Sequence, residues 1–149
     1  MSVDENTDLI ERYFETIWNR GELDREPEFV AEDVIVHAPP IPDIPDGRDG
    51  PLAIVSTFRA ALPDLRLRST VVVAEGDRVV QRWIVNGTHT GTDLFGIAPK
   101  GAPLTLTGIN EFRIEGGRIQ ERWGVMDVLG MLQQLGAVPD PAQSTPPEK

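Results

Sequence analysis

Apolar residues at the start of the chain recur at helical spacing. Between Leu9 and Trp18 they return every three or four positions, and charged residues fill the gaps. This pattern is typical of an amphipathic helix with one face against a core. We expect Asn6 or Thr7 to cap the helix and Gly21 to end it.

The next part of the chain predicts shorter elements. It predicts a short helix over 27–31, a strand over 34–37 and a further helix from Gly50-Pro51 to residue 62. Proline suits the first position of a helix. Four prolines between 38 and 47 exclude a helix or an interior strand, so this segment is expected to be a stiff loop.

From residue 64 onward the period changes to two, which indicates strands. We expect long strands over 65–74, 79–89, 104–114 and 118–125. Gly116-Gly117 is suited to a two-residue hairpin turn. A last short helix is predicted over 128–135, ending at Gly136.

Helices followed by a long antiparallel meander predict an α+β fold with the helices on one face of a curved sheet. Short helices cannot fill the hollow of such a sheet, so a pocket should remain. We expect one domain over 7–136, with disordered segments at 1–6 and at 137–149, the second of these rich in proline.

Composition narrows the possible partners. The 149 residues carry 14 basic and 24 acidic side chains, a net charge of −10. Nucleic acids and anionic membranes are therefore not expected as partners. The chain has no cysteine, and it shows neither a signal peptide nor an apolar run of bilayer length. We expect a cytoplasmic protein.

One polar residue interrupts an apolar row on the predicted sheet. Asn110 shares its strand face with mostly apolar neighbours from Leu104 to Ile114. A buried amide needs partners, so Asn110 is either satisfied within the protein or offered to a ligand. In the last strand neither face is purely apolar, and hydrophobicity alone turns Trp123 inward.

Two further side chains are candidates for proton transfer. His37 ends a strand next to the proline-rich loop, at the rim of the expected pocket. Asp127 ends the last strand, where it is either an acid or base for the ligand or the cap of the following helix. The chain has two histidines, His37 and His89. Neither has a second histidine or a carboxylate at the spacing of metal ligands, so no metal is expected.

Short motifs in a fixed order resemble the SnoaL-like polyketide (ester) cyclase family over about residues 7–136. The motifs are the segments 13–24, 62–65, 74–79, 82–91, 95–99, 116–121 and 129–136. The resemblance implies a nuclear transport factor 2-like cone, a curved antiparallel sheet with helices closing an apolar pocket, often dimeric through the sheet. It also implies aldol ring closure without metal or cofactor, in which an aspartate exchanges protons with the help of a histidine.

The sequence departs from that pattern at both positions. The family's aspartate aligns with Gly124 and its histidine with Asn110, and the alignment turns Gly124 toward the pocket and Trp123 away from it. Asn110, His37 and Asp127 are therefore the candidate catalytic residues. The remaining candidates for contact with an apolar small-molecule substrate are Trp18, Phe58, Trp83, Phe112, Arg122, Gly124 and Met126.

Three functions remain open. The first is a cofactor-independent enzyme of secondary metabolism, for example antibiotic biosynthesis, which cyclises or rearranges a polyketide-like molecule. The second is a binding protein of the same fold without catalysis. The third is an epoxide hydrolase, which requires an Asp-Arg-Asp set that no strand supplies. A homodimer is expected, with Ile109 and Trp123 on the outer face of the sheet.

Overall fold

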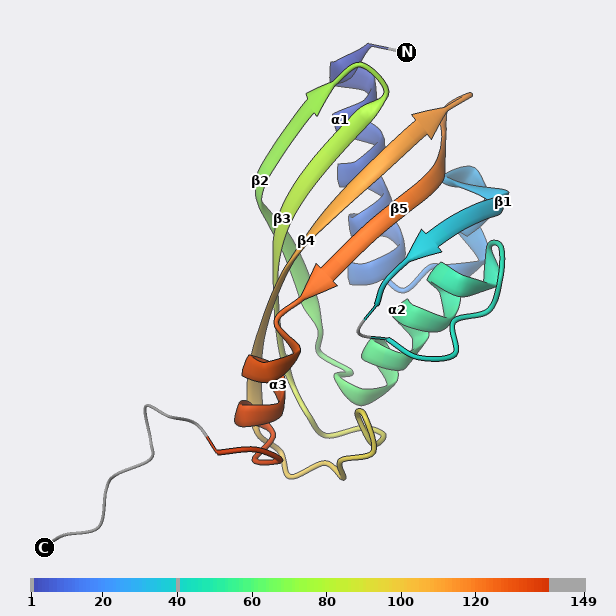
Figure 1. Cartoon of the computed structure of the whole chain (residues 1–149). Helices are drawn as coiled ribbons and strands as arrows, with labels where there is room; N and C mark the ends of the chain where they lie inside the picture. Colours follow the sequence, from blue (N-terminus) through green and yellow to red (C-terminus); the bar gives the residue numbers. More distant parts are fainter. Residues whose placement is uncertain (1, 40, 140–149) are drawn as a thin grey trace, which may run out of the picture.

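A sheet of five strands wraps around the N-terminal helix in the computed structural model, which describes residues 2–39 and 41–139 (Figure 1). In chain order the elements are α1 (Val3–Tyr13), the π-helical η1 (Phe14–Asn19), the 3₁₀-helical η2 (Leu23–Glu28), β1 (Val30–His37), α2 (Asp49–Ala61), β2 (Arg66–Glu75), β3 (Arg78–Thr88), β4 (Pro103–Glu115), β5 (Arg118–Met126) and α3 (Val128–Gln134). The α+β class is confirmed.

The strand order is β1-β5-β4-β3-β2. The four long strands form the predicted antiparallel meander, and β1 joins its edge in parallel with β5. The sheet is therefore mixed, which corrects the expectation of an antiparallel sheet. Parallel pairing needs a long crossover, which the chain between β1 and β5 provides.

The turn between β4 and β5 depends on two glycines that adopt positive φ angles. Gly116 and Gly117 join β4 to β5 with φ angles of 63° and 73°. A type I′ turn needs positive φ at both central residues, and its twist matches that of paired strands. The predicted hairpin is therefore confirmed.

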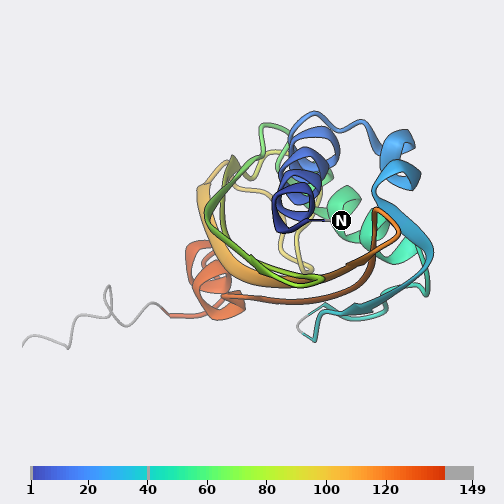
Figure 2. The same cartoon turned by 90° about the horizontal axis from the view of Figure 1, so that it is seen from above.

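The sheet curls so that α1 lies in its hollow, as seen from above in Figure 2. Inward-facing side chains of β3 and β4 alternate with exposed ones, as the period of two predicts. The inner rows meet apolar side chains of α1, η1 and α2 in one core. The candidate site lies between the inner face of the sheet and the helices η1 and α2.

The N-terminus differs from its prediction. The first helix begins at Val3, so the segment 1–6 is not disordered where the structure describes it. Ser2 is the cap: its Oγ accepts from the backbone N–H of Glu5 at 3.1 Å, and the Glu5 carboxylate lies 3.3 Å from the Ser2 nitrogen. Asn6 is buried instead of capping, and its Nδ2 donates to the carbonyl of Gly76.

The observed bounds of η2 and β1 also differ from the predicted ones. The short helix predicted over 27–31 is the 3₁₀ turn η2 a few residues earlier, and the strand predicted over 34–37 already begins at Val30. Of the tail predicted over 137–149, residues 140–149 lie outside the described part of the chain. None of the described helices combines the length and apolar character needed to cross a membrane.

Candidate functional site

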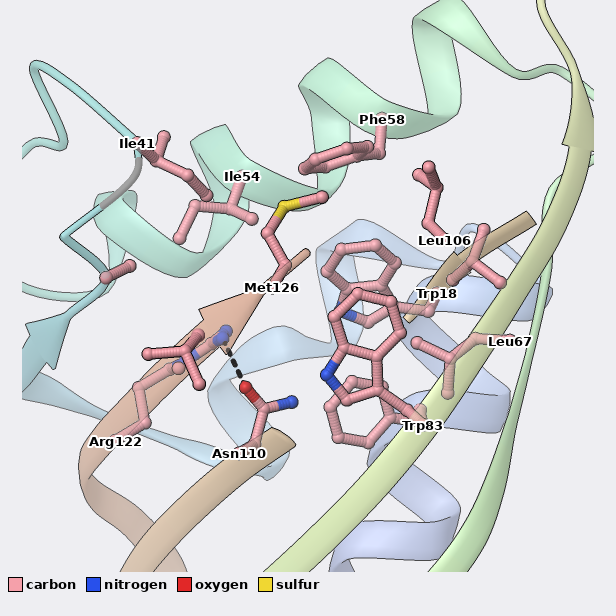
Figure 3. Close-up of a pocket in the computed structure, with 15 residues that line it drawn as sticks. Trp18, Ile41, Ile54, Phe58, Leu67, Trp83, Leu106, Asn110, Arg122 and Met126 are labelled. Atoms are coloured by element: carbon pink, nitrogen blue, oxygen red, sulfur yellow. Dashed lines mark hydrogen bonds between the residues drawn. The ribbon is translucent and has the colours of Figure 1, made fainter. Parts of the chain in front are cut away.

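A cavity opens between the inner face of the sheet and the helices η1 and α2 (Figure 3). The open space between its side chains, counting the solvent at its mouth, is about 500 Å³, and the part that the centre of a water-sized sphere can occupy is about 40 Å³. Most of the surrounding residues are apolar. The lining consists of Phe14, Trp18, Ala38, Ile41, Ile54, Phe58, Leu67, Trp83, Val85, Leu106, Asn110, Arg122, Gly124, Val125 and Met126.

Aromatic rings form much of the wall. Trp18 from η1 and Phe58 from α2 lie with ring centroids 6.0 Å apart. Trp83 from β3 is paired in register with Gly108 of β4. A Cβ atom at Gly108 would collide with the Trp83 indole, so the missing side chain lets that ring lie against β4. Such walls suit a flat, largely apolar ligand.

A chain of hydrogen bonds crosses the sheet at the polar end of the cavity. Gln81 Nε2 donates to Ser69 Oγ at 2.9 Å, and Asn110 Nδ2 donates to Gln81 Oε1 at 3.0 Å. Arg122 Nη2 then donates to Asn110 Oδ1 at 3.0 Å. The chain therefore links β2, β3, β4 and β5, and it fixes the orientation of the Asn110 amide.

Gly124 makes room for the last of these bonds. It lies opposite Asn110 in the β4–β5 register. A Cβ atom at Gly124 would lie 2.7 Å from Asn110 Oδ1 and 2.8 Å from Arg122 Nη2. The space that a side chain would take here is therefore filled by the guanidinium of Arg122.

The Arg122 side chain is buried, and it is only partly satisfied. Its Nε and Nη1 have no hydrogen-bond partner among the described residues, and the same holds for Nε1 of Trp18 and of Trp83. The guanidinium also lies 5.9 Å from the ring centre of Phe112. Burial lowers the pKa of Arg122, although a guanidinium remains protonated in proteins. The cavity thus holds a cation and spare N–H donors.

A buried carboxyl group stands next to this site. Glu26 of η2 is fully buried, and the Tyr13 hydroxyl lies 3.5 Å from its Oε1. Burial is the main cause that raises the pKa of Glu26 to about 7, and burial also raises that of Tyr13. The charges of Arg48 and Arg122 oppose the shift at Glu26.

Sequence reasoning missed Glu26, Tyr13 and Gln81 as polar neighbours of the site. Glu26 lies in the run Leu23–Glu28, where four of six residues are charged, which is typical of a solvated surface. No pattern in the sequence distinguishes Glu26 from its exposed neighbours. Gln81, in contrast, shares an inward row with Trp83, so a polar residue in an apolar row was the available signal.

Most of the predicted contact residues meet at the cavity. Its lining includes the predicted residues Trp18, Phe58, Trp83, Asn110, Arg122, Gly124 and Met126. Phe112 is the exception, because it is fully buried in the core against Phe14 and does not line the cavity.

His37 lies on the opposite face of the sheet from the cavity, which corrects its assignment as a pocket acid or base. Its ring stacks on Trp123, with centroids 5.2 Å apart, and its Nε2 lies 2.7 Å from Glu121 Oε2. The hydrogen bond from His37 is the main cause that lowers the pKa of Glu121. Trp123 therefore faces outward, as the family alignment indicated and hydrophobicity did not.

Asp127 is also not among the lining residues. Its Oδ1 accepts from the backbone N–H of Gly130 at 2.8 Å and so caps α3. Of the two alternatives drawn from the sequence, the geometry favours the cap.

The arrangement can hold an oxygen acceptor but offers no carboxylate in its lining. Arg122 is the one ionisable side chain among the described residues that line the cavity. In the same part of the chain, no three His, Asp or Glu side chains gather where they could hold a metal ion. The chemistry available is thus hydrogen-bond donation and positive charge toward a developing or permanent negative charge.

A family model described as SnoaL-like polyketide cyclase matches residues 8–135. No protein with a curated description matches the chain significantly.

Solved structures share the fold over nearly the whole chain. TsrD from Streptomyces laurentii is 27% identical with a TM-score of 0.82, covering 93% of this chain and 99% of its own. IdmH from Streptomyces antibioticus, a candidate polyketide cyclase, is 32% identical with a TM-score of 0.75, covering 88% and 98%. AclR from Streptomyces galilaeus, a candidate hydroxylase, is 27% identical with a TM-score of 0.80, covering 93% and 85%.

Proposed function

The chain belongs to the SnoaL-like polyketide cyclase family, and from this membership we propose that it is an enzyme of secondary metabolism that cyclises or rearranges a polyketide-like molecule in its cavity. Family and neighbours support a cyclase-like or hydroxylase-like role. The active site is atypical, because Gly124 and Asn110 stand where the family resemblance implies an aspartate and a histidine.

The observation that carries the proposal is the buried guanidinium of Arg122 in an apolar cavity. In an aldol ring closure, a C–H bond beside a carbonyl breaks and its electron pair forms an enolate. The enolate carbon then bonds to a second carbonyl carbon of the same molecule, and that oxygen takes up a proton. Arg122 Nη1 and the indole N–H of Trp83 are buried and have no partner among the described residues. A negatively charged oxygen that enters beside them would satisfy both donors. Fixed donors of this kind lower the barrier to enolate formation.

The aspartate and histidine that the family resemblance implies for proton transfer are absent from this chain. Neither Gly124 nor Asn110 can act as a base. The hydrogen on a carbon between two carbonyls is acidic enough for water to serve when the enolate is stabilised. Glu26, whose pKa burial raises to about 7, is a buried carboxyl group whose charge acts on Arg122, and it has a proton to exchange near neutral pH.

A second candidate is a binding protein without catalysis. The specific observation in its favour is that the described lining contains no carboxylate or imidazole. Epoxide opening is less well supported, because Arg122 bonds to the neutral amide of Asn110 where that chemistry requires carboxylates.

The test is turnover of linear and partly cyclised poly-β-ketones, followed by chromatography and mass spectrometry. A cyclase gives an isomeric product, or one lighter by a molecule of water. Arg122→Gln should lower the rate by roughly 10²–10³-fold, as expected for loss of an oxyanion donor. Arg113→Gln, on the neighbouring strand with its guanidinium paired to Glu121 and Glu115, is the control. Ligand binding without any conversion would favour the binding protein.

A further inference from the structure

The geometry points to a cavity that selects ligands with an anionic oxygen, carboxylate or enolate, on an apolar framework, and that recognises this oxygen through Arg122. This deepens the proposed function by naming the substrate class. It rests on that function only in taking the cavity as the ligand site, and its test requires no turnover.

The first argument is charge. The Arg122 side chain is buried, and its one hydrogen-bond partner in the described part of the chain is the neutral amide of Asn110. Among the described residues no carboxylate lies within 4.0 Å of its guanidinium nitrogens in an ion pair, whereas Arg78 and Arg113 on the outer face have such pairs. A buried cation without a counter-charge is costly, and an anion at the site removes that cost.

Glu26 does not fully supply that counter-charge. Its carboxyl group is close enough for its charge to act on Arg122, and it is shared with Arg48 and with the hydroxyl of Tyr13. Because burial raises its pKa to about 7, a substantial fraction is neutral at physiological pH. The positive charge of Arg122 is thus only partly compensated.

The second argument is the kind of group left without a partner. Arg122 Nε and Nη1 and the indole nitrogen of Trp83 are all donors. Figure 3 shows the guanidinium of Arg122 and the ring nitrogen of Trp83 turned toward the same space beside Asn110. An oxygen acceptor satisfies such groups, and a negatively charged one forms hydrogen bonds about twice as strong.

The third argument is the shape of the remaining wall. Away from Arg122 and Asn110 the lining is apolar, with the rings of Trp18 and Phe58 on one side and Trp83 on the other. The walls therefore match a flat hydrocarbon framework with its charged oxygen at one edge, which enters when the lining side chains move apart, whereas a small inorganic anion would leave the apolar walls uncovered.

Two pairs of probes test the inference. The first pair is 2-naphthoate and 2-naphthamide, which differ in the charge on the polar group. The second is 2-acetyl-1-tetralone, whose C–H between two carbonyls is lost readily to give an enolate, and 1-tetralone, which has only the much less acidic C–H of a simple ketone. Two of the three tryptophans line the cavity, so quenching of tryptophan fluorescence reports binding, and calorimetry gives the affinity. We expect naphthoate to bind roughly 10- to 100-fold more tightly than naphthamide.

Variants assign the preference to Arg122. Arg122→Gln should reduce the naphthoate-to-naphthamide ratio to about one, and Arg113→Gln should leave it unchanged. Trp83→Phe keeps an aromatic ring in the wall but replaces the indole and so removes its N–H. It should lower the ratio by a smaller factor, and it tests the inference even if Arg122→Gln fails to fold. A preference seen only for acetyltetralone over tetralone, and dependent on Arg122, identifies the anion as an enolate.

Three results overturn the inference. They are equal affinities within both pairs of probes, a preference for the anionic probe that is undiminished in both Arg122→Gln and Trp83→Phe, and no binding of any probe. The proposed function fails separately. Selective binding without conversion of any poly-β-ketone defeats catalysis alone, and conversion without a preference for anionic probes defeats only the selectivity stated here.

Discussion

Arg122 reaches across Gly124 to Asn110, and its Nη2 donates to the Asn110 Oδ1 at 3.0 Å. Asn110 and Gly124 are register partners on adjacent strands, so a side chain at position 124 would enter this hydrogen bond. The resemblance to polyketide cyclases implies an aspartate at that position and a histidine at position 110. The chain therefore carries an arginine–amide pair at and beside the positions to which the resemblance assigns an acid–base pair, and the charge of this pair is positive.

Gly124→Ala should disturb this pair. The new Cβ would lie within 2.8 Å of both Asn110 Oδ1 and Arg122 Nη2, so one of them must move. We expect a loss of about 1–3 kcal/mol in the free energy of unfolding, as for other overpacked sites, together with a weaker preference for naphthoate. Denaturant unfolding and probe titration measure both. Unchanged stability and binding would mean that the pair tolerates a methyl group and that Gly124 is not needed for it.

Asn110→Asp should neutralise Arg122 from within the protein. The carboxylate keeps the acceptor for Arg122 Nη2 and converts the hydrogen bond into an ion pair, while the donor to Gln81 is lost. We expect naphthoate affinity to fall at least roughly tenfold and naphthamide affinity to change little. Asn86→Asp, the same change on an exposed residue of β3, is the control. Equal naphthoate affinity in the variant and the wild type would contradict the electrostatic account.

The alternation of apolar and polar residues along the strands was sufficient to predict which side chains of β3 and β4 line the site. Inward rows on β3 and β4 follow from alternation, and they place Trp83, Asn110 and Leu106 at the cavity as expected. Alternation fixes faces because every second side chain of a strand points the same way.

The same reasoning failed where both faces of a strand are covered. In β5, Trp123 is apolar and still faces outward, because the stacked ring of His37 and the guanidinium of Arg78 cover it. Arg122 is charged and faces inward. The outer cover depends on β1 pairing in parallel with β5, a contact between segments about 85 residues apart that no local pattern encodes. Glu26 was missed for a related reason, since its burial depends on tertiary packing alone.

His37→Ala and Asp127→Asn should leave ligand binding unchanged. His37 faces Glu121 on the outer side of the sheet, and Asp127 caps α3. Asparagine is as good a cap as aspartate, so Asp127→Asn should also keep its stability. The measurement is naphthoate affinity and thermal unfolding for each variant. A tenfold loss of affinity in either folded variant would return that residue to the site.

A homodimer is proposed through the outer face of the sheet. Ile109 and Val125 are register partners there and are 47% and 56% exposed, and other exposed apolar residues on the described surface include Val71, Val73 and Ile35. Apolar residues grouped on one face often mark an interface. Light scattering at micromolar concentration should give a particle of twice the 16.4 kDa chain mass. Ile109→Lys should give the single-chain mass, and a wild-type particle of that mass would rule the dimer out.

Glu26 should make the protein less stable as the pH rises toward neutrality. Its pKa is about 7 in the folded protein, against a usual value of 4.5, because burial disfavours its charge. Between these values the unfolded chain releases the proton and the folded chain keeps it, so stability falls as the pH rises from about 4.5 to 7 and then levels off. The groups that face Glu26 and modulate this loss are Tyr13, Arg48, Asp49 and Arg122.

The change amounts to at most about 3 kcal/mol in the free energy of unfolding. Denaturant unfolding at pH 5 and pH 8 measures it in the wild type and in Glu26→Gln, which cannot ionise and should remove this part of the pH dependence. Glu28→Gln, two residues away on the same 3₁₀ turn and exposed, should retain the wild-type dependence. If Glu26→Gln and the wild type lose stability in parallel between these pH values, Glu26 is already ionised in the folded protein and Arg122 has a full counter-charge. In that case the preference for anionic probes should also be absent, so the two experiments check each other.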